Sequence, residues 1–263
     1  MHVELSSTRN PRVRAAAALA RRRERRDRGL HLVEGRHPVR EALAAGAVQE
    51  VFVEAALRED FEVPGVEVHV VADHVLRAIA DATTPQGVVA VAATATVELA
   101  AVVGTGPLLV LDGLADPGNV GTTIRTADAV GAAAVVLTEG CADPFGPKAV
   151  RAAAGSTYHL PLVVGTALAE VVVACRAADQ PTYGLDAGGT RSVFDVDDPR
   201  PLALVLGSEA HGLRDPALLD GTVAIPMAGR AESLNVAAAA AVAAFAVLRP
   251  RDADGTATGG PEG

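Results

Sequence analysis

The stretch Ile225-Pro-Met-Ala-Gly-Arg-Ala-Glu-Ser-Leu-Asn-Val236 decides how the rest of the chain is interpreted. A short apolar strand over 223–225 stops at the proline, and a loop containing Gly229 follows. Ser233 and Asn235 then open a long alanine-rich helix, at a place where capping side chains and free backbone N–H groups are expected. Alone, this stretch predicts a strand, a turn and a capped helix, so its function must be inferred from what precedes it.

The composition predicts alanine-rich helices packed on valine-rich strands. The cysteine content predicts a protein of the reducing cytoplasm. Of the 263 residues, 49% are apolar and only 3% are aromatic. No apolar run follows Met1, and the longest run, 236–248, is shorter than the roughly 18 residues that a membrane span needs. Cys141 and Cys175 stand far apart, which predicts neither a disulfide framework nor a zinc site. We therefore expect a cytoplasmic protein without a membrane segment.

The charge is distributed unevenly along the chain. Although the net charge is −9, the segment 9–40 holds eleven arginines against three acidic residues. Such asymmetry indicates nucleic-acid binding, because arginine contacts phosphate without reading sequence. The alternative is a solvated, salt-bridged helix face around the run 21–28.

The first 96 residues predict a small α/β sandwich, because strand signals alternate with helical patterns. The chain around 15–26 should be helical and carries most of the arginines. The expected strands are 30–33, 48–53, 66–71 and 88–92, and the expected further helices are 38–45 and 73–80. Residues 97–106 lose this rhythm, which predicts a linker.

The segment 107–250 predicts a second α/β domain with a parallel sheet, because its first strands are continuous aliphatic runs. A tail over 251–263, rich in Gly, Thr, Ala and Pro, predicts disorder. The expected strands are 108–111, 134–137, 158–160, 182–185 and 202–206, and the expected helices are 119–130, 148–153 and 166–177.

Three strand-to-loop junctions of this domain carry glycines and polar residues: 111–125, 204–213 and the stretch 225–236. In open parallel sheets, ligands bind where such loops converge at the carboxyl ends of the strands. Neither glycine loop has the spacing of a dinucleotide fingerprint, and the single lysine, Lys148, has no phosphate-loop context. Asp112 and Asp116 have no third ligand nearby in the sequence, so no metal site is expected.

Three motifs follow one another along the second domain: Asn119-Val-Gly121 with Arg125, Gly207-Ser-Glu209 with Gly212, and Ile225-Pro-Met227 with Ser233-Leu-Asn235. In order and with family-like gaps, they resemble the signatures of the SpoU/TrmH family of RNA 2′-O-ribose methyltransferases, which belongs to the SPOUT class. More weakly, the first domain resembles the L30e-like substrate-binding domain that many members carry. The residues concerned are Thr8-Arg-Asn-Pro11, Val33-Glu-Gly35 and Thr84-Pro-Gln-Gly87.

The resemblance implies a SPOUT domain with a trefoil knot, S-adenosylmethionine as methyl donor, and a homodimer whose active site is completed across the interface. It implies that the cofactor contacts come from Leu206, Gly207, Ile225, Met227 and Leu234. It implies that the polar apparatus comes from Asn119, Arg125, Glu209, Ser233 and Asn235.

Chemistry narrows the roles that this polar apparatus can take. A guanidinium stays protonated, so we expect Arg125 to bind phosphate and stabilise the developing 2′-alkoxide rather than to act as the base. Ser233 and Asn235 would orient the ribose hydroxyl. For Glu209 we favour a hydrogen bond to Asn119 or to loop amides over direct proton transfer.

Two further residues lie beside these motifs. We expect His211 to be a surface residue. For Arg151, packing and RNA contact remain equally open.

The expected function is methyl transfer from S-adenosylmethionine to a ribose 2′-OH of structured RNA, with ribosomal RNA preferred by family analogy. The alternatives are a transfer RNA substrate and a non-catalytic RNA-binding module of ribosome assembly that retains the fold. The arginines expected to dock RNA are Arg9, Arg12, Arg22, Arg25 and Arg36.

Overall fold

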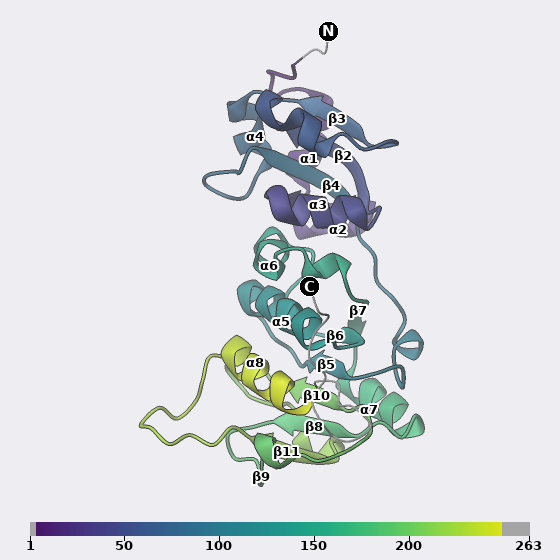
Figure 1. Cartoon of the computed structure of the whole chain (residues 1–263), viewed down its shortest axis with the longest axis vertical. Helices are drawn as coiled ribbons and strands as arrows, with labels where there is room; N and C mark the ends of the chain where they lie inside the picture. Colours follow the sequence, from purple (N-terminus) through teal and green to yellow (C-terminus); the bar gives the residue numbers. More distant parts are fainter. Residues whose placement is uncertain (1–3, 249–263) are drawn as a thin grey trace, which may run out of the picture. The chain divides into compact units, whose positions relative to one another are not determined.

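The computed structural model describes residues 4–248, which form two compact units (Figure 1). Unit 1 takes the N-terminal segment up to residue 95 together with 143–159, and unit 2 takes 96–142 and the chain from 160 onward. The sequence assigned all of 107–250 to one domain. The structure differs for 143–159, because Val150 and Tyr158 pack into the core of unit 1. The tail expected over 251–263 lies outside the described residues.

Unit 1 is a sandwich around a mixed sheet with the strand order β1-β4-β2-β3. Its strands are β1 (Leu30–Glu34), β2 (Val48–Val53), β3 (Glu67–Val70) and β4 (Val88–Ala93). Its helices are α1 (Pro11–Ala18), α2 (Arg22–Arg28), α3 (Arg36–Ala44), α4 (Asp73–Ile79) and α6 (Pro147–Ala153), with the 3-10 segments η1 (Ala55–Phe61) and η3 (Ser156–Tyr158).

Alternation along the strands divides the unit 1 core between two faces of the sheet. Leu32 and Val91 pack with α1 and α4 on one face, whereas their neighbours Val33 and Ala90 pack with α3 and α6 on the other. Successive side chains of a strand point to opposite faces, so both faces can be apolar only when helices cover both. The expected α/β sandwich is therefore present.

The arginine-rich helix expected around 15–26 is two helices. Both sides of the break are rich in helix-forming residues, so propensity alone predicts continuity. The guanidinium of Arg25 donates to the carbonyl oxygens of Leu19 (2.9 Å) and Ala20 (2.8 Å), which satisfies backbone groups at the end of α1. Asp143, which accepts from Arg25 Nη2 (2.6 Å), holds this guanidinium in place, so a residue distant in the sequence supports the break.

Unit 2 contains a parallel sheet with the strand order β7-β6-β5-β10-β8-β11-β9. Its strands are β5 (Leu108–Leu111), β6 (Ala134–Thr138), β7 (Leu162–Thr166), β8 (Thr182–Leu185), β9 (Arg191–Ser192), β10 (Ala203–Leu206) and β11 (Gly221–Ala224). Its helices are α5 (Pro117–Val130), α7 (Leu168–Ala177) and α8 (Val236–Val247), with the short 3-10 segments η2 (Leu99–Ala101), η4 (Val193–Asp195) and η5 (Pro216–Leu218).

Helices cover both faces of this sheet. Helix α7 packs its Val171 and Cys175 on the face that carries Leu108 and Val110. Helices α5 and α8 pack against each other on the other side and reach β6 and β10 (Figure 1). This is the layered α/β architecture expected from the sequence, and the trefoil knot that the resemblance implies stays a prediction.

The prediction of a strand over 158–160 is wrong. Ala154 and Gly155 have φ of 53° and 106°, so the chain turns sharply after α6, and 156–158 form a 3-10 turn instead. The strand of this region, β7, begins only after Pro161. The sequence also missed β9 and η4, because so short a run carries no periodic signal. Within residues 4–248, no helix is long and apolar enough to cross a membrane.

Candidate active site

The carboxyl ends of the central unit 2 strands lie level with one another. The register aligns the residues Leu111, Leu206, Leu185 and Val223 across β5, β10, β8 and β11. The loops after β8, β10 and β11 therefore begin at one edge of the sheet, which is where parallel α/β proteins bind ligands. A pocket of about 580 Å³ opens there between these loops and the start of α8.

The loop after β10 closes tightly on itself. Ser208 N donates to Gly212 O (3.0 Å), and Gly212 N donates to Ser208 O (2.9 Å). A Cβ on Gly207 would collide with the backbone of Gly212, and Gly212 itself has a φ of 64°. Both glycines are thus required by geometry, and the backbone at the pocket floor stays open to a ligand.

The five residues expected to bind cofactor all line this pocket: Leu206, Gly207, Ile225, Met227 and Leu234. Met227 and Leu234 are 39% and 40% exposed, so the pocket presents apolar side chains that a flat ligand can cover. Sequence reasoning missed Asp186 and Glu232, which add carboxylates to the lining. Asp186 belongs to no recognisable motif, and Glu232 lies within the stretch 225–236 but is not one of its motif residues, so the fold reveals both.

Hydrogen bonds join the three sequence motifs beside the pocket. Asn119 Nδ2 donates to Glu209 Oε1 (2.6 Å), and Asn235 Nδ2 donates to Asn119 Oδ1 (3.3 Å). The hydrogen bond expected between Glu209 and Asn119 is therefore present. Asn235 Oδ1 also accepts from Ala237 N (3.0 Å) and Ala238 N (3.3 Å), so it caps α8 while it faces Asn119. We call this set the Asn119 triad: Asn119, Glu209 and Asn235.

The other two polar residues of the motifs lie differently. Ser233 lines the pocket and is exposed. The sequence offered both Ser233 and Asn235 as caps of α8, and the structure shows that Asn235 alone caps the helix. Arg125 lies six residues beyond Asn119 on α5, about 9 Å along the helix axis. It is exposed, is absent from the pocket lining, and has no hydrogen-bond or ion-pair partner among residues 4–248.

A buried carboxylate braces the loops behind the pocket. Asp112, fully buried at the end of β5, accepts from the Thr138 hydroxyl (3.0 Å) and from Arg214 N (3.2 Å). Arg214 in turn donates to Glu139 O (2.7 Å) and packs over Gly113. The brace connects the loops after β5, β6 and β10, and sequence reasoning did not single out Arg214. Asp112 is thus structural.

Cys141 belongs to the same braced region. Burial raises the pKa of the Cys141 thiol, so the thiol stays protonated and its Sγ donates to Leu111 O (3.1 Å). A protonated, hydrogen-bonded thiol is not a nucleophile at neutral pH.

The arginines expected to dock RNA divide into two groups. Arg9, Arg22 and Arg36 are exposed on unit 1. Arg25 is only 6% exposed and donates to Asp143 Oδ2 from Nε (2.9 Å) and Nη2 (2.6 Å). Because its donors are taken by Asp143 and two carbonyls, Arg25 cannot reach phosphate, and we remove it from the proposed RNA contacts.

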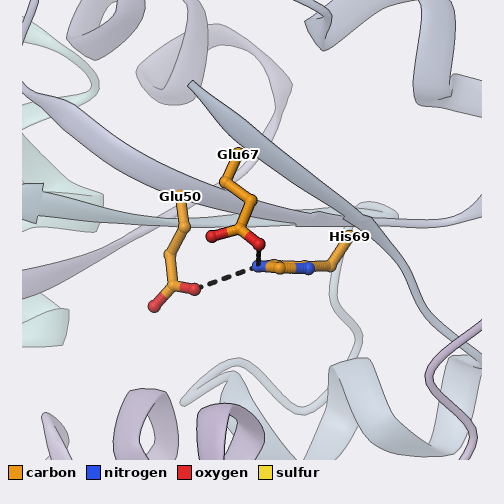
Figure 2. A group of neighbouring side chains, drawn as sticks. All are labelled: Glu50, Glu67 and His69. Atoms are coloured by element: carbon orange, nitrogen blue, oxygen red, sulfur yellow. Dashed lines mark hydrogen bonds and ion pairs between the residues drawn. The ribbon is translucent and has the colours of Figure 1, made fainter. Parts of the chain in front are cut away.

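Arg12 lies beside a cluster formed by Glu50, Glu67 and His69, and Figure 2 shows these three side chains. His69 Nε2 lies 3.1 Å from Glu50 Oε2 and 3.9 Å from Glu67 Oε1, an arrangement that metal ions use elsewhere. Arg12 Nη1 lies 2.7 Å from Glu67 Oε2 and 3.6 Å from Glu50 Oε2, so a cationic side chain of the protein already pairs with both carboxylates. The cluster is therefore an ion-pair network. Arg12 takes part in this network, which limits its availability to RNA.

Two residues left open by the sequence have clear surroundings. His211 is exposed, and its backbone N donates to Ser208 Oγ (3.2 Å). Arg151 pairs with Asp81 (3.0 Å) and Glu34 (3.7 Å) inside unit 1, which favours the packing role.

Comparison with known proteins agrees with this geometry over both units. The family model of the SpoU rRNA Methylase family matches residues 106–245, and that of the MRM3-like substrate binding domain matches 10–90. The chain is 36% identical over 248 residues to the 23S rRNA (guanosine(2553)-2′-O)-methyltransferase RlmP of Bacillus subtilis (strain 168), which covers 92% of this chain and 98% of that protein.

Solved structures give the same answer. An AdoMet-bound rRNA methyltransferase from Sinorhizobium meliloti superposes with a TM-score of 0.84 at 29% identity, covering 93% of this chain and 96% of that one. The SpoU methyltransferase AviRb from Streptomyces viridochromogenes, in complex with AdoMet, has a TM-score of 0.80 at 32% identity. The match covers 90% of this chain and 97% of that one. With the three motifs joined at one sheet edge, the chain belongs to the SpoU rRNA methylase family.

Proposed function

We propose that this protein is an S-adenosylmethionine-dependent methyltransferase that modifies a ribose 2′-OH of ribosomal RNA. The observation that carries the proposal is the Asn119 triad, which brings one residue of each motif to the rim of a pocket lined by apolar side chains and glycine backbone. The names of the relatives support the substrate class, because RlmP acts on 23S rRNA. Because the proposed substrate is ribosomal RNA, the proposed place of action is the cytoplasm.

The pocket fits S-adenosylmethionine by its own chemistry. Leu206, Ile225 and Leu234 provide apolar surface for a purine, and the backbone beside Gly207 is open to its polar edge. The carboxylates of Asp186 and Glu232 can accept from hydroxyl and ammonium groups. When bound, the cofactor supplies an electrophilic methyl group on a sulfonium.

The polar residues then position the nucleophile. Ser233 and the amide of Asn235 present hydrogen-bonding groups beside the pocket, where they orient a ribose hydroxyl. Arg125 cannot accept the proton, because its guanidinium stays protonated, but it can bind a phosphate oxygen and stabilise the alkoxide as charge develops. Glu209 holds Asn119 in place, so we assign it a positioning role.

We infer that the active site is completed by a second copy of the chain. Arg125 is exposed on α5 and outside the pocket of its own chain, which leaves its guanidinium available to the pocket of a second subunit. Helix α8, packed against α5, exposes Val242 (37%) and Phe245 (49%), an apolar surface suited to burial between subunits.

Mixed dimers test this assignment directly. Arg125→Ala removes the guanidinium, and Gly207→Ala blocks the pocket loop of the other chain. If Arg125 acts across the interface, a heterodimer of these two variants holds one intact site and regains activity, while each homodimer is inactive. If Arg125 acts within its own chain, both sites of the heterodimer are damaged and activity stays absent, which would contradict the proposal.

The donor and the substrate are tested separately. Isothermal titration with S-adenosylmethionine should show binding, and a chain without affinity for it would be a non-catalytic RNA-binding module. Mapping of 2′-O-methyl groups in cells with and without the gene should reveal one site lost from ribosomal RNA. A site lost from transfer RNA instead would overturn the substrate class.

A further inference from the structure

A second pocket, in unit 1, forms where two segments noted in the sequence meet. It has a volume of about 510 Å³ and is lined by Arg36, Glu54, Pro85, Gln86 and Gly87. Arg36 follows the segment 33–35, and the last three residues belong to the segment 84–87. The methyl-transfer chemistry proposed for unit 2 uses neither segment.

The pocket is built by fixed backbone contacts. Gly35, with a φ of 99°, donates its N–H to Val88 O (3.3 Å), and Arg36 N donates to Gln86 Oε1 (3.4 Å). The buried carboxylate of Glu34 accepts from Asp81 N (2.6 Å) and from the next amide, Ala82 N (3.0 Å). The loop that carries the pocket wall is therefore held at both ends.

Two opposite charges face this pocket without pairing. Arg36 Nε donates to Gln86 O (3.4 Å), which orients the guanidinium and leaves its terminal nitrogens available. Glu54 N donates to Gly87 O (2.9 Å), while the Glu54 carboxylate lies 3.1 Å from where a Cβ of residue 87 would stand. Among residues 4–248, neither the terminal nitrogens of Arg36 nor the carboxylate of Glu54 has a hydrogen-bond or ion-pair partner.

Glycine at position 87 keeps the pocket open. Its φ of 81° disfavours other residues, and an added Cβ would come within 2.6 Å of Leu57 Cδ1. The half-buried carboxylate of Glu54 can therefore face a ligand directly. A bare phosphate does not match this lining, because a carboxylate repels it.

The arrangement matches the edges of guanine. Guanine alone among the RNA bases presents two adjacent donors, N1–H and the 2-amino group, which a carboxylate can accept together. Its O6 and N7 are the acceptors that arginine reads in a bidentate manner. Adenine, cytosine and uracil place an acceptor beside their donor, so the Glu54 carboxylate would meet a lone pair. The ring of Pro85 offers apolar surface to a base face.

We propose that this pocket binds an unpaired guanine of the RNA substrate, with Glu54 and Arg36 as the residues that determine specificity. The proposal rests on the RNA-modifying function proposed above. It deepens that function by naming the RNA base that unit 1 selects. Unpaired bases are the part of RNA that proteins read through their edges.

The test measures binding of the full-length protein to three fluorescently labelled nine-nucleotide RNAs. Each has a central guanine, inosine or adenine flanked by four uridines on either side. The wild type should bind the guanine RNA about tenfold or more tightly than the adenine RNA. The inosine RNA, which lacks the 2-amino group, should fall between them.

Variants locate the preference in the pocket. Glu54→Gln should lose most of the discrimination between guanine and adenine without weakening adenine binding, whereas Arg36→Ala should weaken the guanine RNA most. Glu59→Gln, an exposed carboxylate of η1 outside the pocket, is the matched control and should bind as the wild type does. Thermal unfolding of each variant should confirm an intact fold.

Two results would overturn the inference: no guanine preference in the wild type, or a preference that survives Glu54→Gln. Titration with S-adenosylmethionine and methylation of ribosomal RNA, run on the same variants, keep the two proposals apart. Absence of guanine selectivity in the wild type, with donor binding intact, counts against the pocket alone. Absence of donor binding in the wild type counts against the methyltransferase proposal alone.

Discussion

Arg25 of unit 1 and Arg125 of unit 2 are the same side chain in opposite surroundings. Arg25 is 6% exposed, and its guanidinium donates to Asp143 and to two carbonyl oxygens. Arg125 is exposed and has no partner within the described part of the chain. Removing a buried, paired arginine leaves its partners unpaired and destabilises the fold, whereas an exposed arginine without partners is free to bind a ligand. A count of arginines in a sequence cannot separate these roles.

Removal of Arg25 should give the largest effect, on stability. Arg25→Met leaves the Asp143 carboxylate without its partner and the end of α1 without its cap, which should cost about 3–5 kcal/mol of unfolding free energy. Chemical denaturation followed by circular dichroism measures this loss. The double variant Arg25→Met with Asp143→Asn should recover part of it, and an unchanged midpoint in Arg25→Met would break the comparison.

Removal of Arg125 should instead abolish turnover and spare the fold. Arg125→Ala should lower kcat by about 10²–10³-fold, the range seen when one donor to a developing oxyanion is removed. Arg125→Lys should recover little, because an ammonium cannot reproduce the planar fork of a guanidinium. Single-turnover methylation measures the rate, and titration should show unchanged affinity for S-adenosylmethionine. A fully active lysine variant would exclude the fork geometry.

A pH titration sharpens the comparison from the side of Arg25. Burial lowers the pKa of His31 from 6.5 to about 4, with Asp143 opposing and Arg25 assisting the shift, and the ring contacts the Tyr158 hydroxyl at 2.8 Å. Between pH 6.5 and about 4 the unfolded chain binds a proton that the folded chain refuses. Stability should therefore fall by roughly 3 kcal/mol as pH decreases through this window.

His31→Gln provides the control for this titration, because glutamine can keep a hydrogen bond to Tyr158 but does not titrate. The urea midpoints of the wild type and the variant should run parallel above pH 6.5, and below pH 6.5 the midpoint of the wild type should fall relative to that of the variant. Parallel pH profiles of the two proteins would show that another group governs the acid sensitivity.

The smallest effect should come from the exposed arginines of α2. Arg22→Ala should leave stability and turnover at saturating RNA unchanged while it lowers the salt dependence of RNA binding. Each lost phosphate contact should reduce the slope of log affinity against log salt by about 0.7–0.9. Arg77→Ala, exposed on α4 and paired with Asp73, is the matched control. An equal slope in both variants would remove α2 from the proposed docking surface.

The sequence indicated the candidate active-site edge because the ends of apolar strands and the glycine loops that follow them are local signals. Asn119, Glu209 and Asn235 lie far apart in the chain, yet each follows a recognisable strand, and parallel strands end at a common edge. The layered fold could be anticipated for the same reason, since continuous aliphatic runs predict buried strands.

The sequence did not predict features that depend on tertiary contacts. The break between α1 and α2 is stabilised by the bonds of Arg25 to two carbonyl oxygens, and Asp143, distant in the sequence, holds this guanidinium in place. The turn at 156–158 follows from the left-handed conformation of Ala154 and Gly155, and alanine gives no signal for it. Arg214 braces three loops although nothing around it in the sequence forms a motif.

The membership of 143–159 in unit 1 has a consequence for how such proteins can be recombined. The chain enters unit 1 twice, and the second visit supplies Asp143, Val150 and Tyr158 to its interior. A gene fragment that ends at residue 95 would encode a unit with gaps where these side chains belong. The two units are therefore poor candidates for exchange as cassettes by a single crossover, and a graft of unit 1 onto another enzyme must carry both segments.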